Sequence, residues 1–303
     1  MTISEFIHRV LLRSPLLRQA AIGTAKAFLR NVVNVRGSCI WINPNDPVIS
    51  SALAFWVYEP DEIAFFCDYF RPDMTFIDVG ANIGLYTGMA MSVAGFDGKI
   101  LAIEPHKESR QFLAKTIASN GNGKQRANVM VSALAALDCA GKSKLYKNSQ
   151  NKGDNRIYPD PMLDEEEVIA TDTLDNICQR YGIESVHFMK IDVQGAEAKV
   201  ISGASNLLRN SADCILMTEF WPYGLSRSGS DPAAYLESLG RLGFTLYELG
   251  RKTKNLSLLD DWDTLISRTH GRKYTNLIGL KGRFAELRPI GDRPVRYFDH
   301  ATH

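Results

Sequence analysis

The stretch that decides the fold is Phe76-Ile77-Asp78-Val79-Gly80-Ala81-Asn82-Ile83-Gly84-Leu85-Tyr86-Thr87. It starts with a short, largely apolar run, which is typical of a buried strand. Glycines and an asparagine follow, and apolar residues then recur at helical spacing from Leu85 onward. Glycine allows positive φ and a close approach of the backbone to a ligand, and a helix start offers free N–H groups. The order of strand, glycine turn and helix therefore predicts a nucleotide-binding βα unit.

The spacing within this turn argues against a dinucleotide site. A dinucleotide-binding turn reads G-x-G-x-x-G and cradles a pyrophosphate, whereas here one residue separates Asp78 from Gly80. This order resembles the first motif of class I S-adenosylmethionine-dependent methyltransferases. The next predicted strand, Lys99–Ile103, ends at Glu104, where a carboxylate can accept two hydrogen bonds from ribose hydroxyls.

The composition excludes several classes of protein. A chain of 303 residues holds one large α/β domain with additions, or two small domains. The net charge of +1 gives no global basic field, so we expect no nucleic-acid partner. No apolar run reaches the length of a membrane span, and the N-terminus lacks the apolar core of a secretion signal. The five cysteines form no C-x-x-C pair, which favours a reduced cytoplasmic protein and argues against structural zinc.

The two ends of the chain differ from its centre. In residues 1–36 apolar residues recur at roughly helical spacing, interrupted at Pro15, and six basic side chains stand against one acid. This pattern predicts an N-terminal helical arm that packs on the domain or a second subunit, or makes weak contact with an anionic membrane surface. Residues 281–303 are polar, with prolines and arginines, and predict a loosely attached tail.

Residues 37–280 predict one domain in which strands and helices alternate. The predicted strands are Ser38–Ile42, Val48–Leu53, Phe76–Val79, Lys99–Ile103, Val129–Ser132, Val186–Ile191, Cys214–Thr218, Phe244–Glu248 and Tyr274–Leu280. The predicted helices are Glu59–Phe70, Leu85–Ala94, Lys107–Ser119, Thr171–Tyr181, Gly195–Leu207 and Pro232–Leu242. Such alternation implies a mostly parallel sheet covered by helices on both faces, which is an α/β fold.

An insertion at about residues 140–171 interrupts the alternation. Ser143–Lys147 and Glu167–Thr171 are predicted to pair as strands around a polar segment. That segment contains Gly153-Asp154-Asn155-Arg156-Ile157-Tyr158. A glycine, polar side chains, a cation and an aromatic ring on one loop suit a lid over a substrate or cofactor, and equally suit a solvated loop.

Four predicted strands end at or next to a carboxylate: Asp78, Glu104, Asp192 and Glu219. In an open parallel sheet, ligands bind at the carboxyl ends of the strands, beside the switch in strand order. We therefore expect these side chains to converge on one crevice. A single acid of this kind could simply cap a helix or lie on the surface, but four acids at the same edge of the sheet favour a ligand-binding site.

The segment Met189-Lys190-Ile191-Asp192-Val193-Gln194-Gly195-Ala196-Glu197 completes a family pattern. Together with Asp78–Gly84, Glu104-Pro105 and Thr171–Leu174, it resembles the FkbM family of S-adenosylmethionine-dependent methyltransferases. The resemblance runs from about Glu59 to Leu249 and leaves the two ends of the chain unexplained. This chain has Gln194 where many relatives carry an acid.

The resemblance implies a seven-stranded, mostly parallel, Rossmann-like methyltransferase sheet and S-adenosyl-L-methionine as the methyl donor. It implies that the methionine end of the cofactor is lined by Asp78, Gly80, Asn82 and Gly84. It also implies that Glu104 holds the ribose, that Ser132 and Ala133 lie near the adenine, and that Asp192 faces the methyl group. Many relatives methylate hydroxyl groups of sugars or other natural products, so we expect a small-molecule acceptor of that kind.

Direct methyl transfer needs an acceptor oxygen aligned with sulfur and carbon, and a base within hydrogen-bond reach of the hydroxyl. Asp192 is the first candidate for this base and Glu219 the second, with His106 and His187 as alternatives. The same two carboxylates could instead hold a divalent metal, but no dense ligand cluster in the sequence supports one. Candidate acceptor-binding residues are Asn155, Arg156, Trp221 and Tyr223.

Two other functions compete with methyl transfer. A nicotinamide-dependent oxidoreductase would share the Rossmann-like sheet, although the turn after Asp78 lacks the dinucleotide pattern. A non-catalytic binding scaffold would keep the fold and bind a partner through the N-terminal helices. The four strand-end acids favour an enzyme over this scaffold.

Overall fold

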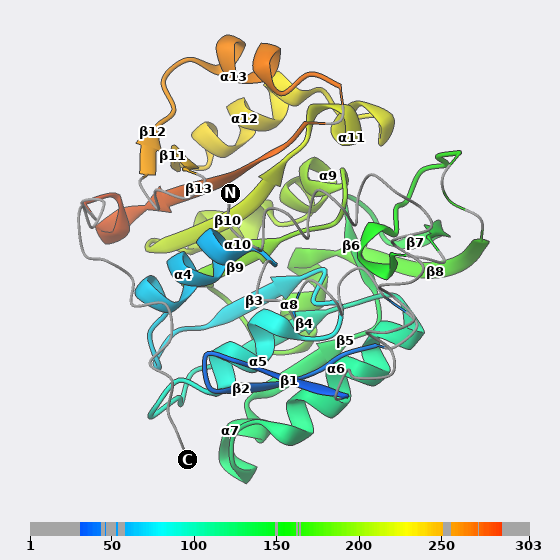
Figure 1. Ribbon diagram of the computed structural model, residues 1–303. Helices are drawn as coiled ribbons and strands as arrows, with labels where there is room; N and C mark the ends of the chain where they lie inside the picture. Colours follow the sequence, from blue (N-terminus) through cyan, green and yellow to red (C-terminus); the bar gives the residue numbers. More distant parts are fainter. Residues whose placement is uncertain are drawn as a thin grey trace, which may run out of the picture.

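The structure is a computed structural model that describes residues 31–43, 46, 53, 58–148, 151–161, 163, 165–250, 256–271 and 273–286 (Figure 1). The predicted helical arm lies outside the described residues as far as residue 30, and the predicted tail does so beyond residue 286. The predicted strand Val48–Leu53 is described only at Leu53. The membrane contact expected of the arm therefore stays a prediction.

The central sheet has eight strands in the order β12-β11-β13-β10-β9-β3-β4-β5. Their bounds are β3 Phe76–Val79, β4 Ile100–Ile103, β5 Val129–Ser132, β9 Phe188–Ile191, β10 Cys214–Phe220, β11 Thr245–Leu249, β12 Leu256–Leu258 and β13 Thr275–Lys281. The five strands from β10 to β5 run parallel, and β13 is antiparallel to both β10 and β11. The predicted fold class is confirmed, and the edge strand β12 is the one strand beyond the expected seven.

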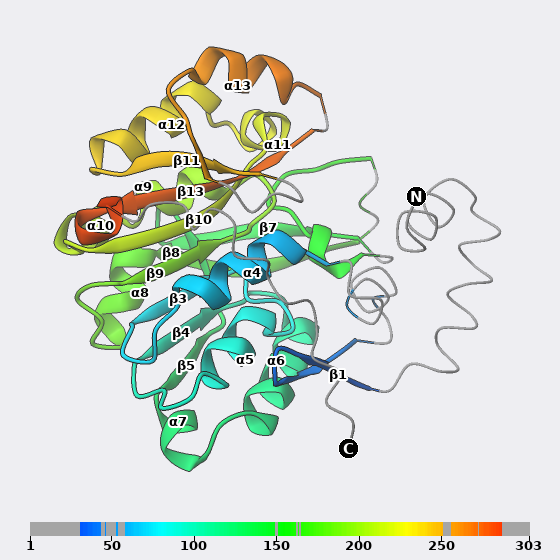
Figure 2. The same ribbon diagram turned by 60° about the vertical axis from the view of Figure 1, so that its left-hand side comes forward.

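Helices cover both faces of this sheet (Figures 1 and 2). Their bounds are α4 Pro60–Tyr69, α5 Leu85–Met91, α6 Lys107–Ser119, α8 Leu174–Arg180, α9 Glu197–Ser202, α10 Ser205–Asn210 and α12 Pro232–Arg241. One core contains Phe76 and Met89 and faces α4 and α5, whereas the other contains Ile77 and Val200 and faces α8 and α9. Adjacent residues of β3 thus point to opposite faces, so a continuous apolar run buries both sides of the strand.

Helix α4 is held against the sheet by aromatic packing. The Phe66 ring centroid lies 5.2 Å from that of Phe76 on β3 and 5.1 Å from that of Phe188 on β9. Such contacts bury large apolar areas, which fixes the helix over the two central strands. The residues just before α4 lie near the carboxyl edge of the sheet, where Glu59 accepts a hydrogen bond from Tyr86 of α5.

The insertion forms a second sheet with the order β6-β8-β7. Its strands are β6 Ala135–Leu137, β7 Gly141–Lys147 and β8 Glu165–Thr173. The predicted pairing of the two insertion strands is confirmed, and the structure shows it to be antiparallel. The sequence did not indicate β6, whose three small or apolar residues pair in parallel with β8. The loop between β7 and β8 contains the short helix η1 Lys152–Asp154, and an isolated bridge joins Tyr146 to Arg156.

A two-stranded sheet precedes the domain and corrects the boundary of the predicted arm. It consists of β1 Val32–Val35 and antiparallel β2 Ser38–Trp41, so residues 32–35 form a strand rather than the end of a helix. Asn120, just after α6, donates to Cys39 O at 2.8 Å and accepts from Cys39 N at 2.8 Å. This pairing fastens the hairpin to the domain, because it satisfies two backbone groups at once.

The sequence did not predict several short helices: α7 Gly123–Ala127, α11 Pro222–Arg227, α13 Trp262–Arg268 and η2 Gly282–Glu286. The last one shows that the chain stays ordered past Lys281, where the tail was predicted to begin. Asp213 fixes it by accepting from Arg283 N at 2.8 Å. Over the described ranges, no helix combines the length and apolar character needed to cross a bilayer.

Candidate active site

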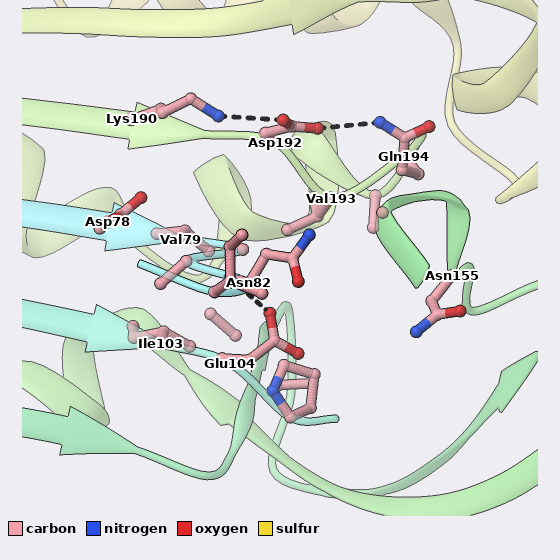
Figure 3. Close-up of a pocket in the computed structure, with 18 of the residues that line it drawn as sticks. Asp78, Val79, Asn82, Ile103, Glu104, Asn155, Lys190, Asp192, Val193 and Gln194 are labelled. Atoms are coloured by element: carbon pink, nitrogen blue, oxygen red, sulfur yellow. Dashed lines mark hydrogen bonds and ion pairs between the residues drawn. The ribbon is translucent and has the colours of Figure 1, made fainter. Parts of the chain in front are cut away.

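A cavity of about 980 Å³, measured with its open mouth, lies at the carboxyl ends of β3, β4 and β9 (Figure 3). Six of the residues singled out in the sequence line it: Asp78, Gly80, Asn82, Glu104, Asn155 and Asp192. The other singled-out residues, Gly84, Ser132, Ala133, Arg156, Glu219, Trp221 and Tyr223, do not. Parallel strands bring their carboxyl ends to one edge, which is why three strand-end acids share this cavity.

Asp78 links the end of β3 to the start of α5. Its Oδ2 accepts from Thr87 N at 3.1 Å and from Thr87 Oγ1 at 2.7 Å, and the side chain is 1% exposed. Burial raises the pKa of Asp78, while the Lys190 ammonium and the hydrogen bonds from Thr87 oppose this rise. The carboxyl group therefore both lines the cavity and stabilises the first turn of α5.

The glycines of the turn serve packing against neighbouring protein. Gly80 has φ +82°, and a Cβ there would lie 2.0 Å from the backbone oxygen of Asp192. Gly84 has φ +87°, and a Cβ there would lie 2.6 Å from Leu113 Cδ1. The absence of both side chains is therefore required by neighbouring protein atoms, and Gly80 also lines the cavity. Asn82, also left-handed with φ 48°, exposes its side chain to the cavity instead.

Glu104 stands at the end of β4 with both oxygens oriented by backbone amides. Oε2 accepts from Asn82 N at 2.9 Å and Oε1 from His106 N at 2.8 Å. Burial raises the pKa of Glu104 to about 7, although these amides favour the ionised form. Each carboxylate oxygen retains a further lone pair, so this group can accept two more hydrogen bonds from a ligand.

Asp192 is held in place by two neighbours on its own strand and turn. Lys190 Nζ lies 2.9 Å from Asp192 Oδ2, and Gln194 Nε2 donates to Oδ1 at 2.9 Å, as Figure 3 shows. Burial alone would raise the pKa of Asp192, but the Lys190 ammonium outweighs it and lowers that pKa. Asp192 is consequently ionised throughout the neutral range.

Glu197 fixes the turn that carries Asp192 and Gln194. The side chain is fully buried, and its Oε1 accepts from the backbone N–H groups of Val193 and Gly195, each at 3.1 Å. Burial raises the pKa of Glu197 to about 7. The turn needs this support because Gln194 occupies the left-handed region with φ 54°.

Glu219 lies beside Asp192 in the sheet but outside the cavity lining. Thr218 pairs with Ile191, so the next residues of β10 and β9 are neighbours. Burial, followed by the charge of Asp192, raises the pKa of Glu219 well above its ordinary value. Within the described part of the chain, its Oε2 is buried without a hydrogen-bond partner. Glu219 therefore favours the neutral form more strongly than an ordinary glutamate does.

The region expected near an adenine ring is displaced by a few residues. Ser132 is buried at the end of β5, where its carbonyl accepts from Glu104 N at 3.1 Å, and neither it nor Ala133 reaches the cavity. Ala135, Ala136 and Leu137 of β6 line the cavity instead. This part of the cavity wall is β6, which begins two residues after Ala133.

The predicted acceptor-binding residues separate into two groups. Asn155 lines the cavity, at the end away from Asp78 in Figure 3. Arg156 is 5% exposed and pairs with Asp154 and Asp160, and its guanidinium lies 4.8 Å from the Trp221 ring centroid. Arg156 and Trp221 therefore join the insertion loop to the end of β10, and their contacts are structural. Tyr223 packs on Trp221, with ring centroids 5.5 Å apart.

The two histidines considered as bases are engaged elsewhere. The His106 ring bonds Ser109 Oγ at 3.0 Å, and His187 Nδ1 accepts from Thr75 N at 3.1 Å. Neither side chain lines the cavity. In the described ranges, no group of three or more His, Cys, Asp or Glu side chains is arranged to hold a metal ion.

Sequence analysis missed three cavity residues that carry polar groups. Tyr58, Tyr86 and Lys190 all line it. Lys190 had a visible signal, because a charge within an apolar central strand is rare unless it is paired. The two tyrosines had none, since each reaches the cavity through the packing of a helix.

A family model described as the methyltransferase FkbM domain matches residues 78–246, which is more than half of the chain. No curated protein matches the chain. Among solved structures, a methyltransferase FkbM from Methylobacillus flagellatus is 16% identical with a TM-score of 0.46, and the match covers 87% of this chain and 59% of that one.

Two further solved structures show the same level of similarity. A methyltransferase from Pyrococcus furiosus is 13% identical with a TM-score of 0.42, covering 88% of this chain and 98% of that one. A SAM-dependent O-methyltransferase from Thermotoga maritima is 12% identical with a TM-score of 0.39, covering 83% and 77%.

Proposed function

The chain belongs to the FkbM family of methyltransferases, whose cofactor is S-adenosyl-L-methionine, and from this premise we propose that it methylates a hydroxyl group of a small molecule. A sugar, a glycan or another natural product is the acceptor class that fits best. The observation that carries the proposal is the shared cavity of Asp78, Glu104 and Asp192 at one sheet edge. The family match favours methyl transfer over the nicotinamide alternative.

The residues present fit a nucleoside ligand. Glu104 offers two preoriented carboxylate oxygens beside the glycine turn, which suits a ribose diol. In the part of the chain that the structure describes, Asn82 Oδ1 is buried without a hydrogen-bond partner, and this side chain lines the cavity. An unpaired buried oxygen is costly, so a donor from a ligand is the expected partner.

When bound, the cofactor supplies a methyl group on a positively charged sulfur, which is already a good leaving group. Asp192 then orients the acceptor hydroxyl and takes its proton, because it is ionised and lines the cavity. Lys190 and Gln194 hold the Asp192 carboxylate in one orientation. Glu219 is a weaker candidate, since it does not line the cavity. Asn155 is the residue of the insertion loop that we propose for acceptor binding.

Calorimetric titration with S-adenosylhomocysteine tests the premise of this proposal. We expect saturable binding by the folded protein, and a complete lack of binding would reject a methyltransferase function. Transfer of a labelled methyl group to a fractionated extract of the source cell then identifies the acceptor. Label recovered only on an amine or a macromolecule would contradict hydroxyl methylation of a small molecule.

Glu104→Gln is expected to weaken S-adenosylhomocysteine binding by about 10- to 100-fold. A neutral amide replaces a carboxylate that accepts charge-assisted hydrogen bonds, each worth about 1.5–3 kcal/mol. Calorimetry measures the change. Glu184→Gln, at an exposed position outside the cavity lining, is the matched control and should bind as the wild type does. Unchanged affinity in Glu104→Gln would place the ribose elsewhere.

Cofactor affinity is also expected to rise with pH. The unliganded protein holds the pKa of Glu104 at about 7, above the ordinary value of a glutamate, and ribose hydroxyls favour the ionised form. Below pH 7, Glu104 must release its proton when the cofactor binds. The affinity should therefore be about tenfold lower at pH 6 than at pH 8. The raised pKa also affects folding. Protonated Glu104 contributes stability at pH values below its pKa in the unfolded chain, and this contribution is lost as the pH rises through 7. The Glu104→Gln variant should show a flatter affinity profile, and an equally steep one would refute the assignment.

A further inference from the structure

The hairpin of β1 and β2 lies across α5 and α6 (Figures 1 and 2). None of its residues lines the cavity, so the methyl-transfer step gives it no direct role. β2 pairs with β1 along one edge only, and the N–H groups of its other edge need partners. Cys39 N donates to Asn120 Oδ1 at 2.8 Å, and Trp41 N donates to Thr116 Oγ1 at 3.1 Å. Because Thr116 and Asn120 are one helical turn apart, α6 satisfies this edge of the hairpin.

The Thr116 hydroxyl continues the hydrogen bonding from the hairpin to the turn between β3 and α5. It accepts from Trp41 N and donates to Ile83 O at 2.9 Å, and the Thr116 side chain is fully buried. A hydroxyl that accepts one hydrogen bond becomes a stronger donor in the next, because bonds in a chain polarise one another. The backbone of the hairpin and the carbonyl of Ile83 are thus joined through a single oxygen atom.

The turn that receives this hydrogen bond has an unusual backbone. Gly80, Asn82 and Gly84 all have positive φ, which is unfavourable for a residue with a Cβ such as Asn82. Asn82 N also donates to Glu104 Oε2 at 2.9 Å, and both Asn82 and Ile83 line the cavity. A displacement of the Ile83 carbonyl would therefore displace Asn82 and lengthen its hydrogen bond to Glu104.

Gly88 of α5 shows how closely the hairpin and the two helices pack. A Cβ at Gly88 would lie 2.7 Å from Ser38 Oγ, 2.9 Å from Ile40 Cδ1 and 2.9 Å from Thr116 Cγ2. Only a hydrogen atom fits where the hairpin, α5 and α6 meet. Contacts this close transmit a displacement from one element to the next, because protein interiors are hardly compressible.

We propose that Thr116 is a positioning residue for cofactor binding and that it uses the N-terminal hairpin to support the turn from Gly80 to Gly84. Thr116 does not line the cavity, and it acts through Ile83 and Asn82 on Glu104. This inference rests on the cofactor of the proposed function. It assigns a role in cofactor binding to a hairpin that lies outside the matched family domain, residues 78–246.

Calorimetric titration with S-adenosylhomocysteine tests this role on two variants at position 116. Thr116→Val keeps the shape of the side chain but removes the hydroxyl, so Ile83 O and Trp41 N lose their shared partner. A turn that adopts the binding-competent form only part of the time lowers the apparent affinity by that fraction, and we expect a loss of about 5- to 20-fold. Thr116→Ser keeps the hydroxyl and should bind within about threefold of the wild type.

Ser119→Ala is the matched control. Ser119 is exposed on the same helix, and its Oγ accepts from Trp41 Nε1 at 2.7 Å, so this variant also removes a hydrogen bond between the hairpin and α6. This bond does not continue to the turn, and the affinity should stay within about twofold of the wild type. Gly88→Ala is an independent second variant, because its Cβ pushes the hairpin and Thr116 away from α5. It should weaken binding as Thr116→Val does.

The pH profile of the affinity separates positioning from a general loss of stability. The Asn82 N–H group favours the ionised form of Glu104, and the charges that face this carboxylate, Arg110 and Asp78, are left unchanged by the substitution. If the turn shifts in Thr116→Val, Glu104 loses this hydrogen bond and its pKa rises further. The midpoint of the profile should then lie at higher pH than in the wild type, whereas Thr116→Ser should keep the wild-type midpoint.

Unchanged affinity in Thr116→Val would overturn the proposal, and so would a loss of affinity without a change in the midpoint. An equal loss in Ser119→Ala would also overturn it, because that loss would come from the attachment of the hairpin in general. Circular dichroism checks that each variant is folded at the assay temperature, and Gly88→Ala decides the outcome if Thr116→Val is not. Wild-type protein that binds no S-adenosylhomocysteine would instead reject the methyltransferase function itself, so the two failures are distinguishable.

Discussion

Asp192→Asn is expected to lower methyl transfer by about 10²- to 10⁴-fold, which is the usual contribution of a positioned general base. The amide keeps the shape of the side chain and can still accept from Lys190, but it cannot take a proton from the acceptor hydroxyl. Because Asp192 binds the acceptor rather than the nucleoside, S-adenosylhomocysteine affinity should stay within about threefold of the wild type. The measurement pairs labelled-methyl transfer with calorimetry.

Two comparisons separate this role from a structural one. Removing the charge beside buried Lys190 costs about 3 kcal/mol of stability, so both assays are run well below the thermal transition of the variant. Glu219→Gln provides the contrast, because Glu219 lies beside Asp192 but outside the cavity lining. It should retain most of the activity. If methyl transfer fell more in Glu219→Gln than in Asp192→Asn, Glu219 would be the general base instead.

Gly80→Ala is expected to destabilise the protein by about 4 kcal/mol or more, which is exceptional for one methyl group. The added Cβ would lie 2.0 Å from the backbone oxygen of Asp192, so β3 and β9 must separate at the cavity edge. Backbone atoms of central strands cannot move as a side-chain tip can. Urea denaturation followed by circular dichroism measures the free energy of unfolding.

Gly95→Ala is the control for conformational strain. Gly95 has φ +74°, close to that of Gly80, but a Cβ there meets no atom within 4 Å. This variant therefore carries only the strain of the left-handed backbone, about 1 kcal/mol. If both variants lost the same stability, the contact with Asp192 would be unimportant and strain alone would explain the glycine.

Most of the sheet could be predicted because its signals are local. An apolar run of four residues between turns predicts a buried strand, and β3, β4, β5 and β9 lie within their predicted ranges. Parallel order follows from the alternation with helices. The convergence of Asp78, Glu104 and Asp192 on one cavity could also be foreseen, since each of these side chains follows a parallel strand.

Roles within the site were harder to predict, because they depend on contacts between distant segments. Arg156 had the composition of a ligand-binding residue, yet two aspartates and the Trp221 ring enclose it. Gly80 lines the cavity, and the absence of its Cβ is also required by the backbone oxygen of Asp192, which the sequence did not indicate. A one-dimensional pattern shows which residue type is needed but does not identify the neighbour that requires it.

The order of residues alone determined the α/β class, the strand ends and the family motif, because these depend on periodicity and on spacing along the chain. Only the tertiary structure decided that Tyr86 contacts both Glu59 and Lys190, that β6 lines the cavity in place of Ser132 and Ala133, and that Glu219 does not line it. Each of these outcomes is set by how a helix or strand packs on the sheet. Such packing brings together side chains from remote parts of the chain, and no short stretch of sequence records it.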